Sequence, residues 1–166
     1  MPVRIPPTTV RTEGLPGFYP DKHKYCHLDG ATLKNDCFVS APVVFNGTDR
    51  QLEMPVGAIP ADNVIIGLCV RNQWNRLQVE NDLPYRFFVK AGDAPYIMAE
   101  GEITMYAEKP LTIMYGQIFV RTTAEGANTR LYAISDTAGV GLVPLGNCRV
   151  VEISNAPGIV WVEARF

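Results

Sequence analysis

IVWVEARF, residues 159–166, ends the chain with side chains that alternate between two faces of an extended backbone. Trp161, Glu163 and Arg165 lie on one face. The opposite face carries Val160, Val162, Ala164 and Phe166. A repeat of two residues is typical of a β-strand with one face buried. We therefore predict that the chain ends in a strand that packs one face against a core.

The same alternation recurs in YRFFVK (85–90), EITMYAE (102–108) and QIFVRTT (117–123). Further strands are expected at about 37–45, 50–55, 64–70, 76–80, 130–135 and 147–154. The 14 glycines and 13 prolines are spread along the whole chain and leave little room for long helices. Short strands separated by turns predict an all-β fold, a compact antiparallel sandwich or barrel of jelly-roll-like form.

Residues 1–30 have a different character from the rest of the chain. They contain five prolines, and their charged residues follow no period. We predict an extended proline-rich arm over 1–30 and a single β-domain over 31–166. Because such arms are usually ordered by lying on a partner, Pro7 and Tyr19 are predicted interface residues.

Composition excludes several functional classes. Hydrophobic residues make up 47% and charged residues 19% of the chain, with a formal net charge of −2. This balance lacks the basic field that nucleic-acid binding requires, so no nucleic-acid partner is expected. VIIGLCV, residues 64–70, is the longest apolar run and is too short to span a bilayer. The first residues lack an apolar signal region, so we expect synthesis in a reducing cytoplasm and no membrane partner.

KHKYCHLDG, residues 22–30, gathers potential metal ligands. The spacing of His23 and His27 brings two ligands to one face only in a helix, which Pro20 and the following turn-like residues limit to one or two turns. Cys37 lacks a closely spaced partner for a second ligand pair. We therefore expect no metal and no cofactor. His23 and His27 are instead predicted interface residues where the arm enters the domain.

No catalytic pattern stands out. The serines Ser40, Ser135 and Ser154 lie outside any G-x-S-x-G motif, and both histidines are in the arm. The carboxylates that a glycosidase-type pair would need are interpreted as strand-end and turn residues; they are Glu80, Asp82, Glu100 and Glu102. We predict that the protein is not an enzyme.

Aromatic residues occur mainly in the predicted strands, so most of them, Tyr115 included, are expected in the core. Trp74 lies instead in the polar loop RNQWNRL. It either covers one end of the barrel or anchors an interface, and we include it among the interface residues.

Residues 109–166 resemble the C-terminal part of tailed-phage capsid cement proteins, also called head decoration or structural cement proteins. The matching pattern is a glycine-led strand ending in arginine, a small-residue loop, a V-P-L step and a glycine-led closing strand. Its residues are Gly116, Ile118, Val120, Arg121, Gly139, Gly141, Val143, Pro144, Leu145, Gly158, Val160, Val162 and Arg165.

The resemblance implies a viral structural protein that binds the outer surface of a phage capsid and stabilises the shell. Its partners would be the major capsid protein and further copies of itself, as a homodimer or homotrimer on the virion exterior. One alternative is a carbohydrate- or receptor-binding β-sandwich module of a virion, with Trp74, Tyr85 and Asp82 as the candidate site. Another is a small hydrolase or isomerase on a cupin-like barrel.

Overall fold

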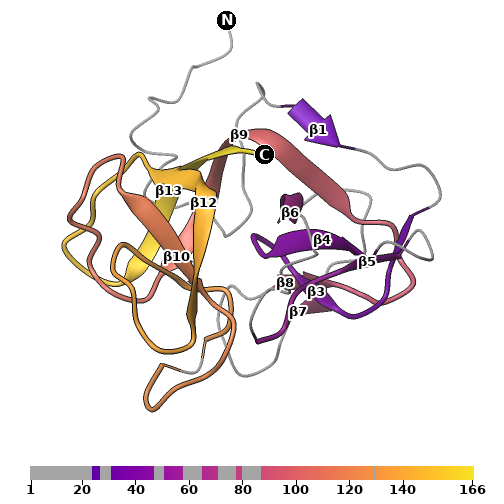
Figure 1. Cartoon of the computed structure of the whole chain (residues 1–166), viewed down its shortest axis with the longest axis horizontal. Coiled ribbons are helices and arrows are strands. Elements are labelled where there is room, and N and C mark those ends of the chain that lie inside the picture. The colour runs from indigo at the N-terminus through magenta and orange to yellow at the C-terminus, as the bar shows by residue number, and fades with distance from the viewer. Residues whose placement is uncertain are drawn as a thin grey trace, which may run out of the picture.

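The three-dimensional structure is a computed structural model of the whole chain (Figure 1). It describes residues 24–26, 31–46, 51–57, 65–70, 78–79, 87–128 and 130–166. Within these ranges every regular element is a β-strand. The predicted all-β fold is confirmed.

The strands are short in the first half of the chain and longer in the second. Their bounds are β1 Lys24–Cys26, β2 Thr32–Leu33, β3 Cys37–Phe38, β4 Pro42–Asn46, β5 Gln51–Glu53, β6 Ile65–Val70, β7 Gln78–Val79, β8 Phe87–Val89, β9 Tyr96–Ala107, β10 Gln117–Arg121, β11 Ile134–Ser135, β12 Leu142–Val150 and β13 Gly158–Arg165.

Five strands close into a barrel in the order β9, β13, β12, β10 and β11. The longest ladder joins β13 to β9 in antiparallel register, from Gly158 opposite Ala107 to Arg165 opposite Glu100. The ring closes where β11 pairs with β10 on one side and, through Ile134 opposite Ala107, with β9 on the other. Closure gives each of these strands a neighbour on both sides, which removes the exposed edges of an open sheet.

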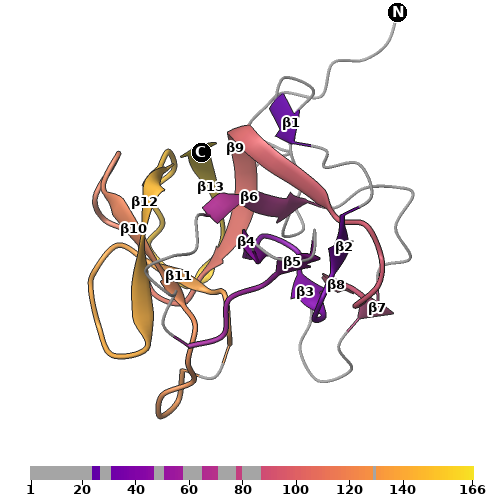
Figure 2. The ribbon, with the colours of Figure 1, turned by 45° about the vertical axis from the view of Figure 1, so that its right-hand side comes forward.

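The twelve residues of β9 also carry the rest of the sheet (Figure 2). Its first residues pair with β6, and β4, β5 and β2 follow in that order. β1, which falls inside the range predicted as an arm, pairs with β9 at Glu100, Met98 and Ile97. A separate sheet of three short strands has the order β3, β8, β7.

Gly67 lets β6 approach β9 closely. Its φ is +156°, and an added Cβ would lie 2.5 Å from both the Ile97 side chain and the Met98 carbonyl oxygen. The register of β4 against β6 shifts at the same point, between Val43 and Val44. Glycine is therefore required where the open part of the sheet meets the shared strand.

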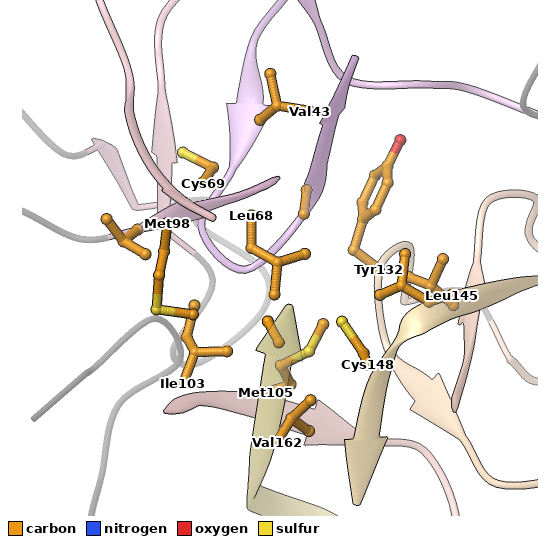
Figure 3. Close-up of a cluster of buried hydrophobic side chains, with 14 of the residues drawn as sticks. Val43, Leu68, Cys69, Met98, Ile103, Met105, Tyr132, Leu145, Cys148 and Val162 are labelled. Carbon is orange, nitrogen blue, oxygen red and sulfur yellow. The ribbon is translucent and has the colours of Figure 1, made fainter. Parts of the chain in front are cut away.

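A single hydrophobic core runs through both halves (Figure 3). The predicted inward residues of the last strand, Val160, Val162 and Ala164, are buried. Trp161 was expected on the opposite, polar face, yet only 2% of it is exposed. On this face Trp161 is buried and Arg165 is exposed to solvent. The predicted alternation of buried and exposed side chains therefore fails at Trp161.

Several strand bounds differ from the sequence prediction. The segment predicted as 37–45 is interrupted at Ser40, whose φ is +73° and whose amide donates to the Cys69 carbonyl. β9 begins at residue 96, well before the predicted 102, and β12 covers 142–150 where 147–154 was expected. The segment 130–135 is mainly a turn, with Tyr132 at φ +63°. In each case pairing with a distant strand sets the bounds, which local alternation does not encode.

Candidate functional site

Five residues were predicted to lie at an interface. Pro7, Tyr19, His23, His27 and Trp74 all lie outside the residues that the structure describes. In the part that it does describe, no group of three or more His, Cys, Asp or Glu side chains is arranged to hold a metal ion. The same residues contain no helix with the length and apolarity needed to cross a membrane.

Three cysteines are buried thiols. Cys37, Cys69 and Cys148 are free and fully enclosed. Burial raises the pKa of the Cys148 thiol, against a small opposing effect of Arg149. A side-chain hydrogen bond with Cys69, together with burial, raises the pKa of Cys37. Because the thiolate is the reactive form, Cys37 and Cys148 are packing residues with low reactivity.

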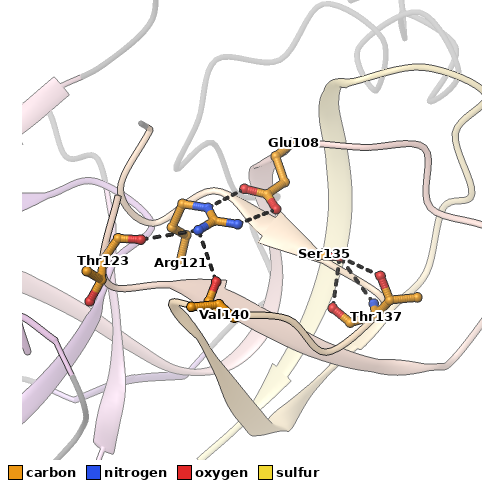
Figure 4. Close-up of polar contacts among 6 residues, drawn as sticks. All are labelled: Glu108, Arg121, Thr123, Ser135, Thr137 and Val140. Carbon is orange, nitrogen blue, oxygen red and sulfur yellow. Dashed lines mark hydrogen bonds and ion pairs between the residues drawn. The ribbon is translucent and has the colours of Figure 1, made fainter. Parts of the chain in front are cut away.

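A buried ion pair joins β10 to the end of β9 (Figure 4). Arg121 donates from Nε to Glu108 Oε2 at 2.6 Å and from Nη2 to Oε1 at 2.9 Å. Only 2% of the arginine side chain and 6% of the glutamate side chain are exposed. This pairing raises the pKa of Arg121, so the guanidinium stays charged. Arg121 stands opposite Ile118 and Val120 in the alternation of residues 117–123, yet it is buried and links β10 to the end of β9.

The same arginine also fixes the loop before β12. Its Nη1 donates to the carbonyls of Thr123 and Val140 at 3.2 and 3.3 Å. Gly141 has a φ of +71°, and a Cβ there would lie 2.6 Å from the Thr123 carbonyl oxygen. The loop therefore requires glycine, and it presents Val140 with 73% of the residue exposed.

The turn between β9 and β10 is held by side chains from other loops. Asp136 Oδ2 accepts hydrogen bonds from the amides of Thr112 and Ile113 and from the Thr112 hydroxyl, at 2.6, 3.3 and 3.2 Å. Leu111 exchanges two hydrogen bonds with Ser154 in the loop before β13, one of them to the serine hydroxyl. The turn therefore has a fixed shape and lies against the 151–157 loop (Figure 1).

This turn exposes three consecutive apolar residues, which we name the apolar turn. Ile113, Met114 and Tyr115 are 50%, 46% and 68% exposed, and Ile153 in the neighbouring loop is 51% exposed. Tyr115 was predicted to be in the core; it lies outside because its φ of +57° turns the chain at the barrel rim. Its amide donates to the Val150 carbonyl at 2.8 Å, which fastens the apolar turn to the end of β12.

An open groove of about 490 Å³ begins at Tyr115 and runs over β12 and β13. Its lining combines an aromatic ring, amide groups and charges: Tyr115, Gly146, Asn147, Arg149, Glu163 and Arg165. Arg165 is paired with Glu163 at 2.5 Å, which raises the pKa of Arg165. Among the residues that the structure describes, Arg149 bonds only main-chain carbonyls, those of Gly146 and Cys148, at 2.7 and 2.8 Å.

The apolar turn and the groove share Tyr115 and together form a continuous surface suited to binding a partner. Glu100 and Glu102 were predicted to be strand-end or turn residues. This prediction is wrong, because both lie inside β9. The sequence signal for the surface was the run TIMYG, residues 112–116, in which apolar residues stand between Pro110 and the next strand. The arginines could not be found this way, since only the pairing of β12 with β13 brings Arg149 beside Glu163.

Comparison with known proteins finds a similarity of fold to a solved structure. No family model and no curated protein matches the chain. A chain in the solved structure described as "The capsid of Myoviridae Phage XM1" shares the fold, with a TM-score of 0.59 and 92% of each chain covered. The two sequences are 12% identical, so the similarity is one of fold.

Proposed function

We propose that this protein is a structural component of a tailed-phage virion that binds the outer surface of the capsid and stabilises the shell. The similarity of fold to a chain of a phage capsid, over 92% of both chains, is the observation that carries the proposal. The major capsid protein is the proposed partner, and the protein acts as a homodimer or homotrimer. We propose that it does so without catalysing a reaction.

The physical properties of the barrel support this role. A cementing protein must transmit force between shell subunits, so it needs a stiff body and contact surfaces. The closed ring of five strands and the buried pair of Arg121 and Glu108 supply stiffness. The apolar turn supplies contact area that a monomer would otherwise leave in water. Many copies on one shell would reinforce modest individual contacts through their effective concentration.

The test is direct binding of the full chain to heads assembled without it. Purified protein is mixed with heads of the phage that encodes it and sedimented, and the bound amount is measured at increasing concentration. We expect saturable binding and a higher temperature of head disruption. Absence of binding at micromolar protein would overturn the proposal.

A second candidate is a carbohydrate- or receptor-binding module of a virion. The exposed ring of Tyr115 beside Asn147 and Glu163 favours it, because sugars stack on aromatic rings and bond to amides and carboxylates. The residues first predicted for such a site, Trp74, Tyr85 and Asp82, lie outside the described ranges. Selective binding on a glycan array, without binding to heads, would establish this function instead.

A further inference from the structure

The apolar turn has the features of a preformed contact. Its backbone is fixed by Asp136, Ser154 and Val150, so little conformational entropy remains to be lost on binding. Yet Met114 and Tyr115 expose large apolar side chains at its tip. Three consecutive exposed apolar residues are uncommon on the surface of a monomer. When hydrogen bonds also hold their backbone in one shape, such residues are suited to a contact surface.

The lining of the groove beside the turn has one arginine more than it has carboxylates. Two arginines and one carboxylate line it, while the whole chain has a formal charge of −2. Arg165 is matched by Glu163. Arg149 has no ion-pair partner among the residues that the structure describes, and it is exposed. The surface therefore offers a cation, Arg149, next to an aromatic ring, Tyr115.

We propose that the apolar turn and this groove form the face that binds the shell. The occupant is an extended segment of the capsid protein that carries apolar side chains and at least one carboxylate. Its apolar side chains cover Ile113, Met114 and Ile153, and its carboxylate pairs with Arg149. This inference rests on the proposed function and assigns that function to one end of the barrel.

The chemistry of the surface favours a protein segment over the other occupants. A glycan would use Tyr115 and the groove but would leave the aliphatic side chains of Ile113, Met114 and Ile153 in water. A second copy related by a two-fold axis would present this same surface, and the one carboxylate in its groove lining, Glu163, is already paired with Arg165, so it would offer Arg149 no free carboxylate. A protein segment with both apolar and acidic residues could cover the apolar side chains of the turn and pair with Arg149 in the groove.

Photocrosslinking identifies the occupant. The photoreactive residue p-benzoylphenylalanine is introduced in place of Met114 in the full chain, and in a control in place of Val140. Val140 is more exposed than Met114, 73% against 46%, and lies at the opposite end of β10 from the apolar turn. After binding to heads and irradiation, crosslinked peptides are identified by mass spectrometry. We expect position 114 to join a shell-protein segment containing apolar residues and Asp or Glu, and position 140 to give little product.

Binding of variants tests the energetics. Tyr115→Asn removes the ring and keeps a residue type that tolerates positive φ, and Arg149→Glu reverses the unpaired charge. We expect each to weaken binding to heads about ten-fold, and the double variant more. The matched controls Val140→Asp and Lys90→Glu change an exposed apolar residue and an exposed cation elsewhere, and should stay within about two-fold. Unfolding midpoints confirm that every variant is folded.

The outcomes separate this inference from the proposed function. If the wild-type chain fails to bind heads, both are wrong. If it binds and the Tyr115 and Arg149 variants bind equally well, only the assignment of the face is wrong. Crosslinks from position 114 to another copy alone, or loss of glycan binding with head binding intact, would likewise overturn the assignment to the shell protein.

Discussion

The closed barrel and the open sheet of the first half share one core but are built differently. In the barrel, strands of up to twelve residues each have two neighbours. In the open half, β2, β3 and β7 are two residues long, and each pairs with one strand among those described. Ion pairs follow the same division: Arg121–Glu108 is buried, whereas Lys34 and Glu53 of the open half keep 53% and 23% of their side chains exposed.

This difference shows where a rigid contact surface can be built. A turn keeps its shape when the strands that flank it cannot separate, and closure provides that restraint. The apolar turn and the groove both belong to the barrel. The short strands of the open half depend on the shared strand β9 and on the core for their position, so β9 is the element through which each half stabilises the other.

The largest expected effect comes from breaking the buried ion pair. Glu108→Ala leaves Arg121 charged, buried and without its bidentate partner, and should lower the free energy of unfolding by about 3–5 kcal/mol. The double variant Glu108→Leu, Arg121→Met removes both charges and should recover at least half of the loss. Urea unfolding followed by fluorescence measures both.

The matched control in the open half is Glu53→Gln. Its partner Lys34 lies 3.4 Å away with 53% of its side chain exposed, so removing the charge should cost at most about 1 kcal/mol. Equal losses for Glu108→Ala and Glu53→Gln would contradict the contrast between the two halves.

A somewhat smaller effect is expected where the halves join. Gly67→Ala forces a Cβ to within 2.5 Å of Ile97 and of the Met98 carbonyl at a φ of +156°, and we expect a loss of about 2–4 kcal/mol. Gly146→Ala is the control, because an added Cβ there meets nothing within 4 Å; it should change stability by less than about 0.5 kcal/mol. If both variants were equally stable, β6 would not need its close approach to β9.

The sequence predicts the features that depend on local alternation and misses those that depend on contacts between distant segments. Alternation predicted β13 and β10 because one face of each is apolar along its whole length, so Val162 and Ile118 stand out locally. Closure could not be predicted, since it depends on Ile134 of a two-residue strand lying opposite Ala107. The burial of Arg121 was not predicted, because its partner Glu108 lies in a distant segment just after β9. Tyr115 was assigned inward because apolar character alone does not distinguish a core residue from a contact residue.

Alkaline pH should destabilise both halves through their buried thiols. The pKa values of Cys37 and Cys148 are raised in the folded protein, so above about pH 8.5 the unfolded chain loses protons that the folded chain keeps. Their contribution to stability is thus complete at neutral pH and declines as pH rises, by at most about 1.4 kcal/mol per pH unit for each thiol. The measurement is urea unfolding between pH 8 and 10.5.

Variants assign this slope to each half. Cys148→Ala removes the thiol of the barrel, so the free energy of unfolding should decrease less steeply with pH than in wild type. Cys37→Ala should have the same effect for the thiol of the open half. Other groups titrate in this range, so the difference from wild type is the quantity that decides. A slope unchanged by either substitution would show that these thiols are not the source.

The smallest expected effect on stability is that of Tyr115→Asn, and Tyr132→Asn is its comparison. Both tyrosines belong to the barrel and have a backbone with positive φ. Tyr115 and Tyr132 have φ values of +57° and +63°, but 68% of the first is exposed and 4% of the second. Tyr115→Asn should leave the free energy of unfolding within about 0.5 kcal/mol of wild type, because asparagine tolerates positive φ and no buried contact is lost. Tyr132→Asn should cost about 3–5 kcal/mol, since its ring packs against Phe38 and its hydroxyl donates to the Pro55 carbonyl. Tyr132 thus ties the barrel to the open half, whereas Tyr115 lies outside the core. A large loss of stability in Tyr115→Asn would mean that the apolar turn supports the barrel instead of being carried by it.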